Sequence, residues 1–186
     1  YAPRPINEGQ AVILSELARE DFTGMGISFG AGMVNVCLSF MSVPLVKFSV
    51  TRSGDWIDQQ VAMAMNETDS RVSSVKEATL DLTKQEGLTK IERALSIYYN
   101  HLIEYVLENI KQELNKQKIE SSLTKPISIV LSGGTSLPNG FIDRFRQILE
   151  QLNFPLAISE VRMAARPLDS VAKGALIAAQ TEENRG

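Results

Sequence analysis

The stretch Ser132-Gly133-Gly134-Thr135-Ser136-Leu137-Pro138 decides how the chain is expected to fold. An apolar run at 127–131 leads directly into it, and a helical pattern begins near Pro138. Two adjacent glycines after a buried strand let the backbone approach a ligand, and they point the amide groups of the next helix at it. The stretch therefore favours a nucleotide-facing turn, with an ordinary strand-to-helix turn as the alternative for the glycine pair alone.

A second glycine-rich turn, Gly30-Ala31-Gly32-Met33, lies earlier in the chain. It joins strand-like runs at 25–29 and 34–41, and a third run follows at 44–51. Links this short predict an antiparallel meander. Backbone amides at the tip of the first hairpin are suited to binding phosphate.

The remaining pattern alternates between helix and strand. Helices are expected at 7–19, 54–66, 70–83, 89–117, 138–152 and from 167 onward, with further strands at 127–131 and 154–158. The apolar stripe of the helix at 89–117 is expected to pack in the core. This order predicts an α/β fold with a mixed sheet of about five strands, the antiparallel meander first, covered by helices.

Composition limits the classes of function. The chain has 186 residues, of which 44% are hydrophobic and 22% charged, and its net charge is −3. The sequence has no stripe of basic residues, so its charge pattern gives no reason to expect a nucleic-acid partner. No apolar stretch is long enough for a membrane span, and the first residues lack a signal-peptide pattern, so a cytoplasmic location is expected.

The chain has one cysteine, Cys37, and one histidine, His101. A single cysteine excludes a disulfide framework, and its place in an apolar run predicts a buried structural thiol rather than a reactive one. His101 falls in a long helix, where a packing or surface role is expected. The two residues supply neither a transition-metal site nor a Cys–His nucleophile pair.

Five segments in order resemble the C-terminal half of the actin-like ATPases: residues 6–12, 30–36, 54–58, 132–135 and 167–175. The pattern is similar to bacterial actin homologues that build filaments and to the nucleotide-binding domain of the seventy-kilodalton heat-shock chaperones. The resemblance implies an RNase-H-like second lobe over 6–186, a tail or cut linker at 1–5, and a reduced helical insertion at about 54–88. It also implies that the N-terminal lobe of the same protein is missing, so that this chain alone is not expected to hydrolyse ATP.

The resemblance assigns roles to particular positions. It places the phosphates of ATP or ADP near the first turn and the adenosine near the second, with two further adenosine contacts on the helix at 70–83. It also implies that Glu8 orients the attacking water, with Gln10 as a near alternative. The phosphate residues are Gly30, Ala31, Gly32 and Met33, and the adenosine residues are Gly133, Gly134, Thr135, Ser136, Lys76 and Thr79.

Four positions depart from the family pattern, and two of them, Lys76 and Thr79, stand where the chaperones would show Glu and Lys. Ser28 stands where the family usually has an aspartate that holds the water shell of the metal, and a neutral hydroxyl does not supply that charge. Met33 replaces a usual hydroxyl donor. No metal ligand is therefore expected in this lobe, and Mg²⁺ would enter only with the nucleotide.

Two functions from different classes follow. The first is an ATPase whose nucleotide state opens and closes a cleft, and so gates self-assembly or the binding of a protein partner. The second is a nucleotide-independent scaffold that keeps the actin-like fold. A third reading, an unrelated α/β domain in which the glycines form plain turns, also remains open.

Overall fold

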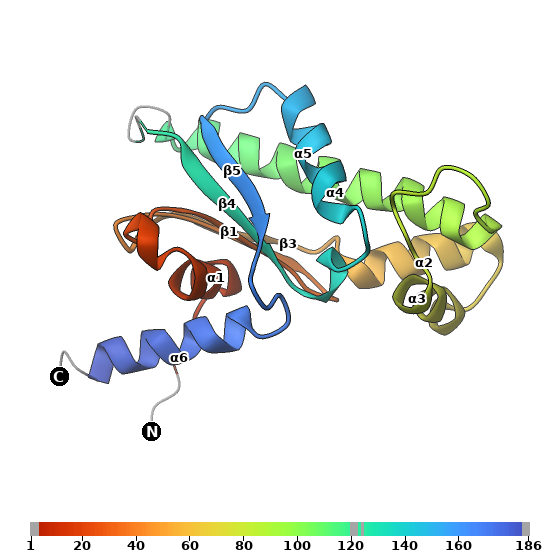
Figure 1. Cartoon of the computed structure of the whole chain (residues 1–186), viewed down its shortest axis with the longest axis horizontal. Coiled ribbons are helices and arrows are strands. Elements are labelled where there is room, and N and C mark those ends of the chain that lie inside the picture. Colours follow the sequence, from red (N-terminus) through yellow and green to blue (C-terminus); the bar gives the residue numbers. More distant parts are fainter. Residues whose placement is uncertain (1–3, 120–122, 124, 184–186) are drawn as a thin grey trace.

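The computed structural model describes residues 4–119, 123 and 125–183, with the backbone only at 182 and 183. A mixed sheet forms its middle layer, with strand order β3-β2-β1-β4-β5 (Figure 1). The meander β1–β2–β3 is antiparallel, whereas β4 runs parallel to β1 and β5 parallel to β4. The predicted α/β class with five strands and the meander first is confirmed. The strands are β1 Gly24–Phe29, β2 Val34–Phe40, β3 Val43–Val50, β4 Ile127–Ser132 and β5 Ile158–Met163.

Helices cover both faces of the sheet (Figure 1). Helix α1 lies against one face with α6 packed on it, α4 and α5 lie against the other face, and α2 and α3 extend beyond the end of the sheet beside α4. Two short 3-10 turns, η1 and η3, follow α1 and β4. The helices and turns are α1 Glu8–Glu16, η1 Ala18–Glu20, α2 Gly54–Met65, α3 Asp69–Ala78, α4 Lys90–Lys116, η3 Gly134–Ser136, α5 Phe141–Gln151 and α6 Ser170–Glu183.

Alternation along β1 gives the sheet two different faces. Met25, Ile27 and Phe29 belong to the main core beneath α4 and α5. The alternate positions, Gly26 and Ser28, meet α1 instead. The face beneath α4 and α5 is therefore filled by large apolar side chains, and the face beneath α1 by small ones.

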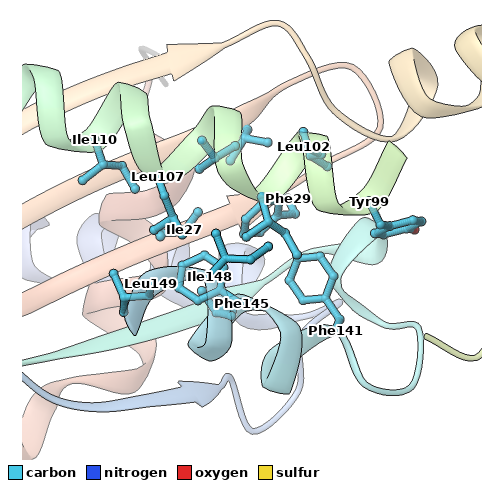
Figure 2. Packing of buried hydrophobic residues seen from close by; sticks show 14 of the residues in the cluster. Ile27, Phe29, Tyr99, Leu102, Leu107, Ile110, Phe141, Phe145, Ile148 and Leu149 are labelled. Atoms are coloured by element: carbon cyan, nitrogen blue, oxygen red, sulfur yellow. The ribbon is translucent and has the colours of Figure 1, made fainter. Parts of the chain in front are cut away.

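The main core gathers around Phe29 at the end of β1 (Figure 2). Its ring meets the edges of two α5 rings, at 5.1 Å from Phe141 and 6.3 Å from Phe145. Tyr99 of α4 extends this packing, with its ring 6.0 Å from Phe141. The predicted core stripe of the long helix is confirmed for most of its members, but Ile97 is 50% exposed and faces away from the sheet.

The predicted strand at 154–158 is wrong. The N–H of Phe154 donates to the carbonyl of Leu152 in a turn, and Pro155 has no N–H to give to a ladder. The strand begins at Ile158 and forms one edge of the sheet. Its Glu160 and Arg162 interrupt the apolar pattern that a strand prediction relies on.

The predicted helix at 70–83 ends early, at Ala78. The N–H of Leu82 donates to the carbonyl of Asn139 at 2.8 Å, and Asp81 forms a bridge with the same residue. Residues 79–82 thus leave the helix to join the loop before α5. The predicted tail at 1–5 lies mostly outside the described residues.

Candidate functional site

Two glycines bring the start of α1 onto the sheet. A Cβ atom on Gly26 would lie 2.2 Å from the carbonyl oxygen of Gly9, and a Cβ on Gly9 would lie 2.6 Å from the carbonyl oxygen of Gly26. Only hydrogen fits at either position. This close approach places Glu8 beside the end of β1, where the Oγ of Ser28 donates to its Oε2 at 2.8 Å.

A row of small polar side chains crosses four strands in register. Ser49, Asn35, Ser28 and Ser132 pair across β3, β2, β1 and β4. The Oγ of Ser49 donates to Oδ1 of Asn35 at 2.6 Å, and the Oγ of Ser132 donates to the carbonyl of Pro167 at 2.8 Å. The row is neutral, so Glu8 brings a negative charge to a part of the sheet that has none of its own.

The hairpin tip between β1 and β2 is fixed through one carbonyl group. The carbonyl of Gly30 accepts from the hydroxyl of Ser53, from the N–H of Gly54 at 3.4 Å and from the hydroxyl of Thr135 at 2.7 Å. The carbonyl of Ala31 accepts from the N–H of Asp55 at 2.9 Å. The two glycine-rich turns and the start of α2 are therefore held together as one unit.

A cavity of about 540 Å³ opens beside this unit. That volume is within the usual range for small-molecule sites. The hairpin tip, the loop before α5 and helices α2, α3 and α4 all contribute to its walls. The lining residues are Ala31, Asp55, Asp58, Ser73, Lys76, Glu77, Leu80, Tyr99, Gly134, Thr135, Leu137, Pro138, Asn139 and Leu168.

A buried ion pair forms part of the wall. The Nζ of Lys76 lies 2.6 Å from Oδ2 of Asp58, and the two side chains are 11% and 9% exposed. Burial raises the pKa of the Asp58 carboxyl, and the hydrogen bond from Lys76 acts in the opposite direction. Because each charge is shielded from water, each depends on the other for its stability in this wall.

Two polar atoms of the wall are buried without a hydrogen-bond partner among the described residues. They are Oδ1 of Asp58 and the hydroxyl of Tyr99. Burial, followed by the charges of Asp58 and Glu77, raises the pKa of Tyr99, so its phenol stays protonated. An acceptor and a hydroxyl in one wall suit a ligand that carries its own donors and acceptors.

The structure brings together some of the predicted adenosine and phosphate residues. Ala31, Gly134, Thr135 and Lys76 all line the cavity, although they come from separate segments. Gly32 and Met33 are exposed at the hairpin tip. The amide of Gly30 donates to the carbonyl of Met33 at 3.0 Å and closes the turn.

Other predicted residues lie apart from the cavity lining. The hydroxyl of Thr79 donates to the carbonyl of Val75 at 3.1 Å, and that of Ser136 donates to the carbonyl of Gly133 at 2.7 Å. Gln10 is half-buried in α1, where its backbone amide donates to the capping side chain of Asn7 at 3.2 Å. The predicted roles of these residues stay predictions.

Sequence reasoning did not single out Ser73, Glu77, Tyr99 and Asn139 as site residues. Ser73 and Glu77 lie on the same face of α3 as Lys76, and spacing along that helix is a signal that could have found them. Tyr99 and Asn139 reach the cavity only through the packing of α4 and the loop before α5. No local pattern in the sequence marks that packing.

Among the described residues, no group of three or more His, Cys, Asp or Glu side chains is placed to hold a metal ion. No helix in that part of the chain is both long and apolar enough to cross a membrane.

The sheet order and the helices on both faces define the fold of one lobe of an actin-like protein. Three solved structures share it at low sequence identity. They are a MamK double helical filament (TM-score 0.73, 18% identity), MreB5 of Spiroplasma citri bound to ADP (0.67, 16%), and the ethanolamine utilization protein EutJ from Carboxydothermus hydrogenoformans (0.64, 18%). They match 93%, 96% and 92% of this chain.

Within that class, the chain belongs to the volactin family, whose model matches residues 1–179. The comparison with curated protein sequences gives no significant match. The chain spans 58% of the MamK chain, 60% of the MreB5 chain and 55% of the EutJ chain.

Proposed function

We propose that this chain is the lobe of an actin-like protein that binds ATP or ADP in the cavity beside Gly30. One observation carries the proposal: the carbonyl of Gly30 accepts hydrogen bonds from both Thr135 and the start of α2. The two glycine-rich turns are thereby held beside a cavity whose wall includes the hydroxyl of Tyr99, which has no hydrogen-bond partner within the described part of the chain. A nucleotide has both a phosphate end and a polar base to occupy such a site.

The proposed contacts follow the walls of the cavity. The phosphates lie at the hairpin tip near Ala31, and the adenosine lies against Gly134, Thr135 and Lys76. Glu8 orients the attacking water from the start of α1, where Ser28 holds its carboxylate. Hydrolysis requires the N-terminal lobe of the protein to close over the phosphates, because this lobe supplies one wall of the cleft only.

Relatives of the same fold support a nucleotide ligand and self-assembly. One MamK structure is bound to AMPPNP and another is a double helical filament, and MreB5 is bound to ADP. By analogy, nucleotide state sets the opening of the cleft in this protein and so controls its association with further copies or with a protein partner.

A specific observation favours the scaffold as second candidate. The ammonium group of Lys76 is already paired with Asp58 inside the cavity, and the amide of Gly30 is used within its own turn. These two groups are satisfied within the chain itself and need no nucleotide to be stable. In that case the fold is kept for its surfaces.

Calorimetric titration of the full-length protein with ADP and ATP, with and without Mg²⁺, separates the two candidates. A nucleotide-binding lobe gives saturable binding that Ala31→Phe weakens at least about tenfold, because the new ring fills the cavity. Ala157→Phe, at an exposed position before β5, is the matched control and leaves binding unchanged. Absence of binding by the natural protein supports the scaffold.

A further inference from the structure

The polar row offers Glu8 a single contact, the hydroxyl of Ser28. Asn35 on one side of Ser28 accepts from Ser49, and Ser132 on the other side donates to Pro167. We propose that Ser28 is a positioning residue that holds the carboxylate of Glu8 in place for water attack on the bound nucleotide. This inference rests on the proposed function and assigns a role to the residue that replaces the usual aspartate.

The backbone around this contact is rigid. β1 lies between β2 and β4, and Ser28 pairs with Asn35 and Ser132 on its two sides. Its side chain is buried, with the residue 2% exposed. The contact between Gly9 and Gly26 fixes the start of α1 against the same strand. The fold therefore fixes the backbone at both Ser28 and Glu8. Their side chains have little conformational freedom left to lose when the reacting water is positioned.

A hydroxyl suits this position better than a carboxylate. The distance of 2.8 Å is typical of a hydrogen bond between two oxygens, and a bond of this kind to a charged oxygen is stronger than one between neutral groups. A serine donates to Glu8 without adding charge, and it engages only one of the two carboxylate oxygens. An aspartate at the same place would repel Glu8 unless a cation lay between them.

The reaction that Glu8 serves is hydrolysis of the terminal phosphate. A water oxygen forms a bond to the γ-phosphorus, and the bond from that phosphorus to the bridging oxygen breaks with its electron pair going to ADP. One proton of the water is released to solvent. Glu8 accepts a hydrogen bond from this water. Because Ser28 holds the carboxylate of Glu8 in one orientation, the water can donate to it from a limited range of directions.

The test is a double-mutant cycle in the full-length protein, with steady-state turnover and calorimetric ATP binding measured on each variant. Ser28→Ala is expected to lower kcat about tenfold while KM and the ATP Kd stay within about twofold, because the lost contact acts on the reacting water and not on the nucleotide. In a Glu8→Gln background the same change is expected to have no further effect. Ser28→Thr keeps the hydroxyl and is expected to restore most of kcat.

Ser128→Ala is the control for simple loss of a buried serine. Ser128 lies on β4, is 7% exposed, and hydrogen-bonds Glu160 instead of Glu8. Its variant is expected to keep the natural kcat. An unchanged kcat in Ser28→Ala, or an equal loss in the Glu8→Gln background, overturns the positioning role. ATP binding without turnover by the natural protein overturns this role alone, and absence of binding overturns the proposed function with it.

Discussion

At the scale of single residues, Ser28 separates this chain from the pattern it resembles. Introducing the usual aspartate through Ser28→Asp places two carboxylates in contact, because the Glu8 oxygen lies 2.8 Å from the present hydroxyl. The two carboxylates repel each other when both are ionised, and protonation of either at acid pH removes the repulsion, so the variant is expected to lose more stability at neutral than at acid pH.

The variant is therefore expected to melt below the natural protein at pH 7, with a smaller difference at pH 4 or in millimolar Mg²⁺. Ser28→Asn is the neutral control and should show no such pH dependence. Thermal melts followed by circular dichroism measure both variants. A Ser28→Asp protein that melts at the natural temperature at pH 7 would show that the Ser28–Glu8 contact is absent in solution.

Cys37 illustrates a residue whose environment was predictable from sequence. The thiol is buried, and burial raises its pKa from 9.0 to about 12. A thiol held protonated is expected to react very slowly with Ellman's reagent at pH 8 in the folded protein, and at once after unfolding in guanidinium. Stability is expected to decline between pH 9 and 12, since only the unfolded state loses its proton there. Rapid labelling without denaturant would contradict the buried position.

At the scale of elements, the contact between α1 and α6 depends on Gly174. A Cβ atom there would lie 1.8 Å from the carbonyl oxygen of Ala11. Gly174→Ala is expected to cost about 3 kcal/mol, a fall in Tm of roughly 6–12 °C, because the two helices must separate. Gly32→Ala, where the nearest atom is 3.9 Å away, is the matched control in the same thermal melts. Equal Tm values for the two variants would refute the close packing.

The long helix α4 begins with a capping box. The hydroxyl of Thr89 accepts from the N–H of Glu92 at 3.2 Å, and the N–H of Thr89 donates to Oε2 of Glu92 at 2.8 Å. Thr89→Ala is expected to lower the free energy of unfolding by about 1 kcal/mol in urea titrations, whereas Thr89→Ser should lower it much less.

The same backbone hydrogen bond lowers the pKa of Glu92, so its contribution is present above the unfolded value and lost as pH falls through the folded one. The cost of Glu92→Ala, which removes this carboxylate, should therefore shrink at acid pH. A cost that is independent of pH would contradict the capping role of Glu92.

Most elements were predictable because their patterns are local. The hairpin tip at Gly30–Met33 and the core stripe of α4 follow from turn chemistry and helical spacing. The strand β5 was predicted at the wrong residues because, as an edge strand, it carries charged side chains. The end of α3 was predicted too late because the N–H of Leu82 donates to the carbonyl of Asn139 and not to a carbonyl of the helix. Each error arose where a distant partner decided the local structure.

At the scale of the whole molecule, the site depends on contacts between residues far apart in the sequence. The two glycine-rich turns were recognisable, but the hydrogen bond from Thr135 to Gly30 that joins them spans 105 positions. The packing of Tyr99 behind the cavity likewise depends on the placement of α4 against α5. Sequence could therefore indicate the components of the site but not the cavity that they enclose.

The proposed nucleotide site is the cavity beside Gly30. The most direct test is a map of backbone amide chemical shifts in the full-length protein during titration with ADP. A nucleotide bound in this cavity is expected to cause the largest changes at Ala31, Lys76, Gly134 and Thr135, with residues of the distant loop before β5 unchanged. Saturating ADP that leaves these four amides unshifted, or shifts only residues outside the cavity, would contradict the proposed site.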